Sequence, residues 1–175
     1  MVVSRIRLDP STTQIGRDEM AETVDTSNVI IPPPIAWALA IFAGVAADWL
    51  YPWRFIPEPI PHVRVGAAVL ASGVALAIWA IATMRKAGTR VEPHKPTTTI
   101  VAHGPYRFSR NPIYIGMFLG QAGLAIGLDN LWMLVMLMPF GLVIRYGVIA
   151  REEAYLERKF GAVYLGYKSR TRRWL

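Results

Sequence analysis

The sequence predicts an all-α integral membrane protein, with about four transmembrane helices and a C-terminal helical segment at the cytoplasmic interface. Hydrophobic residues make up 53% of the 175 residues, and charged residues make up only 18%. The hydrophobic residues gather in blocks, and a helix needs ~20 apolar residues, at ~1.5 Å rise each, to cross a bilayer. The predicted spans are 30–50, 65–84, 112–128 and 131–150. We expect residues 30–175 to form one membrane domain, preceded by a polar N-terminal arm over residues 1–29.

The first two spans are bounded by prolines and by basic residues. Prolines at 32–34 mark the beginning of the first helix, since proline is tolerated in a first helical turn. Asp48 is the only charged residue in this first block. A proline-rich connection over 51–62 carries aromatic residues that favour the membrane interface. The second block has no charge, and its helix is expected to end near 85–88, where cations and a glycine suit a C-terminus.

The third and fourth spans predict an antiparallel helical hairpin. Asn111 is a good N-cap, and Pro112 fits the first position of a helix. Residues 127–130 are typical of a tight turn between the two helices. Gly116 and Gly120 stand four residues apart, so they give the third helix a small face for close packing.

The polar region after the fourth span keeps a helical period. Leu156, Phe160 and Tyr167 belong to one apolar stripe at helical spacing. We expect a helical extension that breaks at Gly161 and folds back onto the membrane surface. The run Arg-Thr-Arg-Arg-Trp-Leu over 170–175 is typical of an interface anchor, with cations for lipid phosphates and a tryptophan for the headgroup layer.

The distribution of positive charge predicts the orientation in the membrane. Six Lys and Arg residues lie in 85–112 and seven in 151–175, whereas the 51–62 connection has only Arg54. Because cytoplasmic loops carry the excess of Lys and Arg, both termini and the 85–112 loop are expected on the cytoplasmic side, in the inner membrane if the cell is bacterial. Topology and lipid phosphates account for the net charge of +7, so no nucleic-acid partner is expected.

Several classes of site are excluded by what the sequence lacks. It has no cysteine, which excludes disulfides, thiolate metal sites and cysteine nucleophiles. No spacing of His, Asp and Glu matches a metal motif, and no Gly-rich phosphate loop occurs. Ser109 has no evident base partner, so a serine hydrolase triad is unsupported.

Residues 103–116 place polar groups at the mouth of an apolar helix. A helix N-terminus carries roughly half a positive charge and free N–H groups. Arg107 and Arg110 add full charges beside it, which makes an anion site suited to a carboxylate or a phosphate. The alternative is a capped helix whose arginines reach to the interface.

A second polar group lies where the last apolar block ends. Arg145 is inside that block, seven residues before Glu152, a spacing that places both on one face of an α-helix. Charges at membrane depth are costly and are usually functional or paired. Glu152 and Glu153 are suited to accept hydrogen bonds from a diol or to attract a cation. A structural network of arginine and glutamate is the alternative.

In their combination and order, these motifs resemble the isoprenylcysteine carboxyl methyltransferase family, and phospholipid N-methyltransferases share the same broad plan. The motifs are Gly-Pro-Tyr-Arg-x-x-Arg-Asn-Pro-x-Tyr-x-Gly at 104–116, Arg-Glu-Glu-x-x-Leu-x-x-x-Phe-Gly-x-x-Tyr-x-x-Tyr at 151–167, and Arg-Trp-Leu at 173–175. The resemblance covers about residues 85–175. It implies an integral membrane, mostly helical enzyme that uses S-adenosylmethionine.

The resemblance also implies where the cofactor binds. Elements within 89–116 and 145–175 would wrap S-adenosylmethionine on the cytoplasmic side, and two tyrosines of the second element would close over it. The expected cofactor-binding residues are His103, Gly104, Pro105, Tyr106, Arg107, Arg110, Asn111, Pro112, Tyr114, Gly116, Glu152, Glu153, Tyr164 and Tyr167.

We therefore expect methyl transfer to a lipophilic or membrane-embedded acceptor, such as an isoprenylcysteine-like carboxylate or a phospholipid amine. Arg145 is the candidate catalytic residue on the acceptor side, and Glu92, alongside His94, is the candidate proton acceptor for an amine. The alternatives are methylation of a small thiol or amine, and a non-catalytic accessory or transport protein on the same scaffold. Cofactor binding separates that last alternative from the enzymes.

Overall fold

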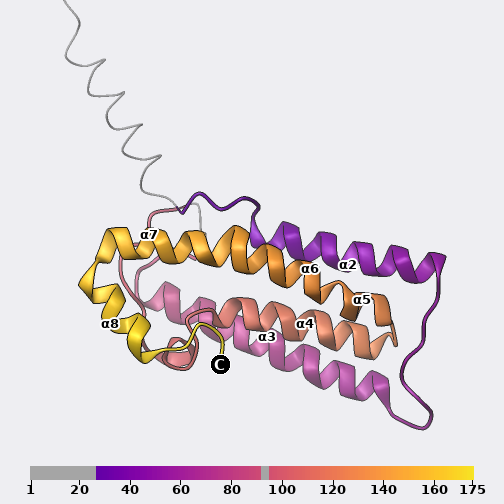
Figure 1. Cartoon of the computed structure of the whole chain (residues 1–175). Helices are drawn as coiled ribbons and strands as arrows, with labels where there is room; N and C mark the ends of the chain where they lie inside the picture. The colour runs from indigo at the N-terminus through magenta and orange to yellow at the C-terminus, as the bar shows by residue number, and fades with distance from the viewer. Residues whose placement is uncertain (1–26, 92–94) are drawn as a thin grey trace, which may run out of the picture.

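The computed structural model describes residues 27–91 and 95–175, and the regular elements in this part of the chain are all helical. Successive long helices lie side by side along one axis and alternate in direction (Figure 1). In chain order the elements are α2 (Pro33–Leu50), α3 (His62–Lys86), η1 (Gly104–Arg107), α4 (Pro112–Gly127), α5 (Leu131–Val135), α6 (Leu137–Leu142), η2 (Val143–Ile149), α7 (Ala150–Phe160) and α8 (Ala162–Arg170). The predicted all-α class is confirmed for the described residues.

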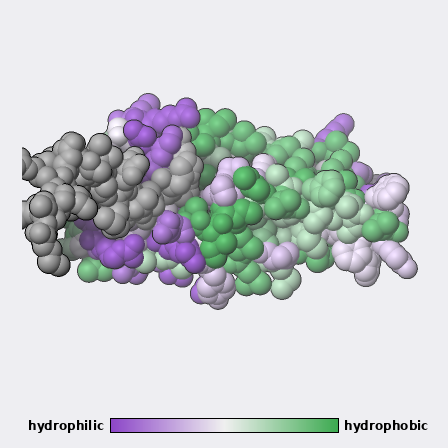
Figure 2. All heavy atoms as spheres, turned by 90° about the horizontal axis from the view of Figure 1, so that it is seen from above, coloured by the Kyte–Doolittle hydropathy of each residue, from purple (hydrophilic) through white to green (hydrophobic). Residues whose placement is uncertain are grey.

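Three helical segments are long and apolar enough to cross a membrane. They are α2, α3 and the continuous run Leu131–Phe160, which joins α5 to α7. The predicted third span, α4, is apolar but has only 16 residues. At 1.5 Å per residue it extends about 24 Å, less than the ~30 Å of a typical hydrocarbon core. Figure 2 shows a hydrophobic surface over the middle of the molecule and hydrophilic residues toward the end that carries α7 and α8.

The short helix α4 is held against α3 by glycines on both sides. A Cβ on Gly73 would lie 2.7 Å from both the carbonyl oxygen of Gly116 and the amide nitrogen of Gly120. A Cβ on Gly123 would lie 2.4 Å from the amide nitrogen of Leu70. No side chain fits between the two backbones at these points, so the predicted role of the α4 glycines in close packing is confirmed.

The fourth helical run contains an irregular segment that the sequence pattern does not reveal. Residues of η2 are π-helical, with wider turns than the α-helical segments on either side. The prediction that Arg145 and Glu152 share one face assumed α-helical spacing. Arg145 is instead exposed, with its guanidinium 5.4 Å from the centre of the Tyr146 ring, whereas Glu152 is half-buried.

The turn between α4 and α5 anchors the 51–61 connection at the far end of the molecule. Asp129 Oδ1 accepts hydrogen bonds from the backbone N–H groups of Phe55 and Ile56, each at 3.0 Å. Arg54 donates to the carbonyl oxygens of Leu128 and Asp129. The backbone N–H of Phe55 is the main cause that lowers the pKa of Asp129 below its ordinary value of 3.8.

The polar end is built by a sharp reversal of the chain. Gly161, at φ +50° and ψ −124°, separates α7 from α8, in a backbone region that favours glycine. The predicted break at this residue is confirmed. The chain then returns to α4, where the Trp174 ring lies edge to face on Phe118, with 5.8 Å between centroids. The ring therefore takes part in the helix packing, and its expected place at the headgroup layer stays a prediction.

Candidate functional site

A pocket opens at the polar end, where the α4 N-terminus, α7 and α8 meet the 90–101 loop. It contains about 890 Å³ of open space, a figure that includes the solvent at its mouth. Its wall combines charged residues, tyrosines and apolar side chains such as Met84, Ile100 and Val101. The pocket therefore offers both ionic and apolar surfaces to a ligand.

Nine of the fourteen residues predicted to bind a cofactor line this pocket. They are Tyr106, Arg110, Asn111, Pro112, Tyr114, Glu152, Glu153, Tyr164 and Tyr167. Two segments separated by about forty residues are thus brought together by the return of α7 and α8 over the beginning of α4 (Figure 1).

The other five predicted residues lie outside the pocket wall. His103 and Arg107 are exposed. Gly104 has a φ of +60° and approaches the side chain of Thr83, so its conformation and its packing on α3 explain the glycine. Pro105 is buried in the η1 turn, and Gly116 packs on the α3 backbone. For these five the structure shows a structural or surface position outside this pocket, and their role in cofactor binding stays a prediction.

Of the two predicted catalytic residues, only Arg145 lies in the described part of the chain. It is exposed on η2 and does not line the pocket, so its role near an acceptor stays a prediction. Glu92 lies outside the described residues, as does His94.

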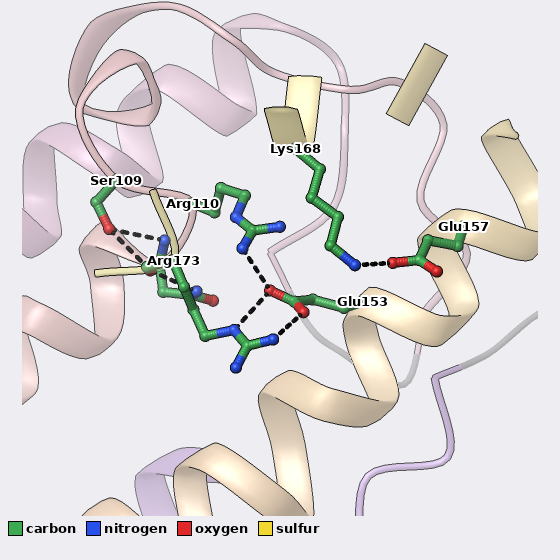
Figure 3. Close-up of polar contacts among 7 residues, drawn as sticks. Ser109, Arg110, Glu153, Glu157, Lys168 and Arg173 are labelled. Carbon is green, nitrogen blue, oxygen red and sulfur yellow. Dashed lines mark hydrogen bonds and ion pairs between the residues drawn. The ribbon is translucent and has the colours of Figure 1, made fainter. Parts of the chain in front are cut away.

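Glu153 joins two arginines in a buried ionic cluster (Figure 3). Its Oε2 accepts from Arg173 Nη2 at 2.7 Å, and its Oε1 accepts from Arg173 Nε at 3.1 Å. The same Oε1 lies 3.3 Å from Arg110 Nη2. Only 9% of each of the Arg110 and Glu153 side chains is exposed. Both oxygens of Glu153 are thus engaged, which leaves it poorly suited to the diol or cation predicted for it.

Arg110 has donor capacity that the described residues leave unused. Its Nε and Nη1 are buried and have no hydrogen-bond partner there, and the same is true of the Tyr106 hydroxyl. Buried polar groups without partners are costly, at roughly 1–3 kcal/mol each, and in native structures they call for an explanation. Since both residues line the pocket, a ligand with acceptor atoms would satisfy them.

Glu152 presents a second, separate carboxyl group to the same pocket. Its Oε1 accepts a hydrogen bond from the Tyr114 hydroxyl at 2.8 Å, and both residues line the wall. Glu152 makes none of the ion pairs found among the described residues. The pocket therefore holds the guanidinium of Arg110, just before α4, and a carboxyl group on α7.

Tyrosines close the pocket from the side of α8. The Tyr167 hydroxyl donates to the carbonyl oxygen of Tyr106 at 2.8 Å, which fastens α8 to η1. Burial, followed by the charge of Glu153, raises the pKa of Tyr164 to about 12. Burial also raises the pKa of Tyr106 and of Tyr167 well above the ordinary value. All three phenols therefore stay protonated near neutral pH, so that the hydroxyls of Tyr106 and Tyr164 are able to donate hydrogen bonds to a ligand.

The predicted cofactor elements 89–116 and 145–175 include a loop segment and Tyr155 that line the pocket, but the sequence singled out none of these residues. The backbone N–H of Thr97 donates to the Tyr155 hydroxyl at 3.1 Å, which holds this loop on α7. Loop residues such as Thr99 carry no periodic pattern that would have marked them. Tyr155 stands three residues after Glu152, and that helical spacing was an available signal.

The C-terminal segment belongs to the predicted element 145–175, but its contacts with the beginning of α4 were not predicted. Asn111 occupies the predicted N-cap position of α4, but its side chain makes no capping hydrogen bond. Its Nδ2 donates instead to the carbonyl oxygen of Arg173 at 2.9 Å. The prediction placed residue 173 in a lipid anchor, and only the fold reveals that it contacts the beginning of α4.

This fold and this site define a class of protein: a helical membrane protein with a polar, charged pocket at one end. The sequence model of a family described as phospholipid methyltransferase matches residues 61–163. That match covers more than half of the chain, and the protein belongs to the phospholipid methyltransferase family. The chain is also 41% identical over 63 residues to an uncharacterized protein of Haemophilus influenzae, which covers 36% of this chain and all of that protein. No solved structure matches the chain.

Proposed function

We propose that this protein is an integral membrane methyltransferase that uses S-adenosylmethionine and acts on a lipophilic acceptor, an isoprenylcysteine-like carboxylate or a phospholipid amine. The observation that carries the proposal is that Arg110 and Glu152 line the same pocket. Arg110 is buried with two unpartnered nitrogens, and Glu152 supplies a carboxylate from the adjacent helix. A ligand with one anionic and one cationic group matches this arrangement, and the amino-acid end of S-adenosylmethionine has both.

The remaining wall fits the other parts of the cofactor. The tyrosines of η1 and α8 provide aromatic faces and hydroxyl donors for an adenine. Apolar side chains such as Met84 and Val101 give the cofactor and the acceptor a dry surface. Family membership supports the same conclusion, because phospholipid methyltransferases generally use S-adenosylmethionine.

The chain's own contribution to the reaction is binding and alignment. The bound cofactor supplies an electrophilic methyl group on a sulfonium. Arg110 and Glu152 fix the amino-acid end, and the tyrosines of α8 exclude water from the pocket. Alignment of two reactants in a fixed geometry contributes up to ~7–11 kcal/mol to lowering a barrier, so no nucleophilic side chain is required. An amine acceptor has to lose a proton, and Glu92 is the proposed acceptor of that proton.

Radiolabelled cofactor tests this proposal and identifies the acceptor class. The detergent-purified protein is incubated with methyl-labelled S-adenosylmethionine and a total membrane lipid extract, and the products are separated by chromatography. Label in a lipid fraction is expected, and the labelled headgroup or chain end distinguishes the acceptors. Label in water-soluble thiols or amines would support the small-molecule alternative. Failure to bind the cofactor in a parallel titration would favour a non-catalytic scaffold and defeat the proposal.

A further inference from the structure

We infer that Arg173, in the C-terminal segment 171–175, is a positioning residue that sets the charge of the pocket's anion site through Glu153. The inference rests on the proposed function, in that the anion is taken to be the carboxylate of S-adenosylmethionine. Arg173 itself is not part of the pocket wall, whereas Glu153 and Arg110 are. Its effect on a ligand would therefore pass through these two residues.

The contacts place Glu153 between the two guanidinium groups. Figure 3 shows Arg110 from above and Arg173 from below directed at the same carboxylate. Arg173 donates two hydrogen bonds to it, at 2.7 and 3.1 Å, and Arg110 lies farther away at 3.3 Å. Arg173 thus takes up most of the acceptor capacity of Glu153. Arg110 is left with Nε and Nη1 unpartnered, and these nitrogens are available to a second anion.

The backbone of the same segment fixes the position from which Arg110 acts. The backbone N–H of Arg110 donates to the carbonyl oxygen of Arg172 at 3.0 Å. The Arg173 carbonyl oxygen accepts from Ser109 Oγ at 3.2 Å as well as from Asn111 Nδ2. The C-terminal segment therefore holds both the main chain and the ionic partner of Arg110.

A charge count shows what Arg173 adds. Arg110 and Glu153 form a buried pair with no net charge, and Arg173 raises the net charge of the cluster to +1. Inside a protein, where the effective dielectric constant is far below that of water, such a charge attracts an anion strongly. Without Arg173, an incoming carboxylate would meet only the Arg110–Glu153 pair, which has no net charge. Arg173 thus makes Arg110 available to a carboxylate.

Two ligands that differ by a single group provide the test. S-adenosylmethionine and its decarboxylated form share the adenine, ribose, sulfonium and amine, and differ only in the carboxylate. The affinities of both are measured by calorimetry on the full chain in detergent. The ratio of the affinity for S-adenosylmethionine to the affinity for the decarboxylated form reports the contribution of the carboxylate alone. A general loss of folding or of pocket shape would weaken the binding of both ligands together.

The chain offers a matched set of variants. Arg173→Gln should reduce the ratio roughly tenfold or more, the scale of one charged hydrogen-bonding interaction. Arg173→Lys keeps the charge without the forked geometry and should retain most of the ratio. The double variant Arg173→Gln with Glu153→Gln restores a net charge of +1 and should regain it. Lys168→Gln is the control, because Lys168 pairs with Glu157 across α7 and α8, is 34% exposed like Arg173, and lies outside the pocket wall.

The outcomes separate the inference from the proposed function. A wild-type protein that binds S-adenosylmethionine more tightly than the decarboxylated form, with the ratio lost only in Arg173→Gln, supports both. An unchanged ratio in Arg173→Gln, or a ratio that the double variant fails to regain, overturns the role of Arg173 and leaves the function intact. If Arg173→Gln does not fold, Arg173→Lys provides the test. Because lysine keeps the positive charge, loss of the preference for S-adenosylmethionine in this variant overturns the inference that the charge of Arg173 sets the anion site. A wild-type protein that binds neither ligand overturns both proposals.

Discussion

Two neighbouring glutamates at the beginning of α7 have different partners and, on this account, different roles. Glu153 is occupied by Arg173 and Arg110 and belongs to the frame of the pocket. Glu152 has only the neutral hydroxyl of Tyr114 on its Oε1 and faces the same cavity. Their different roles could not be predicted from the sequence, because they depend on the contact of Glu153 with a residue twenty positions further along the chain. Glu152 is the carboxylate left to meet a cationic or diol group.

The role of Glu152 is tested by Glu152→Gln. The amide oxygen can still accept from the Tyr114 hydroxyl, so the local packing should persist while the charge is lost. We expect the affinity for S-adenosylhomocysteine to fall about tenfold, the usual value of a charge-assisted hydrogen bond. Calorimetric titration in detergent measures it, with an unchanged melting temperature as the control. Affinity equal to that of the wild type would remove Glu152 from the site.

The lowered pKa of Asp129, at the opposite end of the molecule, predicts that the folded state loses stability as the pH falls. Its pKa is lowered in the folded state, chiefly by the backbone N–H of Phe55. The stabilisation is therefore fully present above the unfolded value of 3.8 and is lost as the pH falls through the lower folded value. Asp129→Asn keeps an acceptor oxygen and suits the φ of +48° found there. The variant should show a smaller fall in melting temperature below about pH 4 than the wild type. Parallel curves for the two proteins would contradict this assignment.

At the scale of elements, the sequence predicted those boundaries that depend on local chemistry. The beginning of α4 at Asn111-Pro112 and the break at Gly161 both follow from backbone preferences of single residues. The π-helical turns of η2 were not predictable, because the apolar residues there have no pattern that separates π from α spacing. The same holds for the return of the C-terminal segment to α4, which is a contact between distant parts of the chain.

The contact between α3 and α4 is expected to depend on single glycines. In Gly73→Ala the new Cβ would meet backbone atoms of Gly116 and Gly120 at 2.7 Å, so the helices have to separate. We expect a loss of about 1–3 kcal/mol, the usual cost of overpacking. Gly120→Ala is the matched control, since its Cβ would meet no backbone atom and nothing closer than the Trp37 ring at 3.4 Å. Thermal unfolding in detergent compares them, and equal melting temperatures would show that this packing is looser than the structure indicates.

Across the whole molecule, the sequence predicted only part of the candidate site. The predicted residues that line the pocket lie in η1, at or just before the first turn of α4, and on α7 and α8. Motif membership alone put His103 and Arg107 in the same set, although they are exposed. A motif identifies a stretch of chain, and the direction of each side chain is decided by how the stretch packs. Thr97 could not be singled out in the same way, because its backbone contact with Tyr155 joins distant parts of the chain.

The orientation of the chain in the membrane is a prediction for the whole molecule. Lys and Arg are concentrated at the end with the pocket, which is expected on the cytoplasmic side. The chain has no cysteine, so single cysteines can be introduced without removing any. In intact cells, an impermeant maleimide should label Glu58→Cys and should label Ser169→Cys only after the membrane is opened. The reverse pattern would place the pocket on the outer side and contradict a cytoplasmic cofactor.

The central claim is that the pocket binds S-adenosylmethionine through the buried guanidinium of Arg110. Its most direct test is calorimetric titration of the detergent-purified wild type and of Arg110→Gln with S-adenosylhomocysteine, the demethylated product. The account predicts saturable binding of one ligand per chain by the wild type, and an affinity at least about tenfold lower in the variant. Equal affinity in the two proteins, or no binding by a wild type that melts cooperatively, would contradict it.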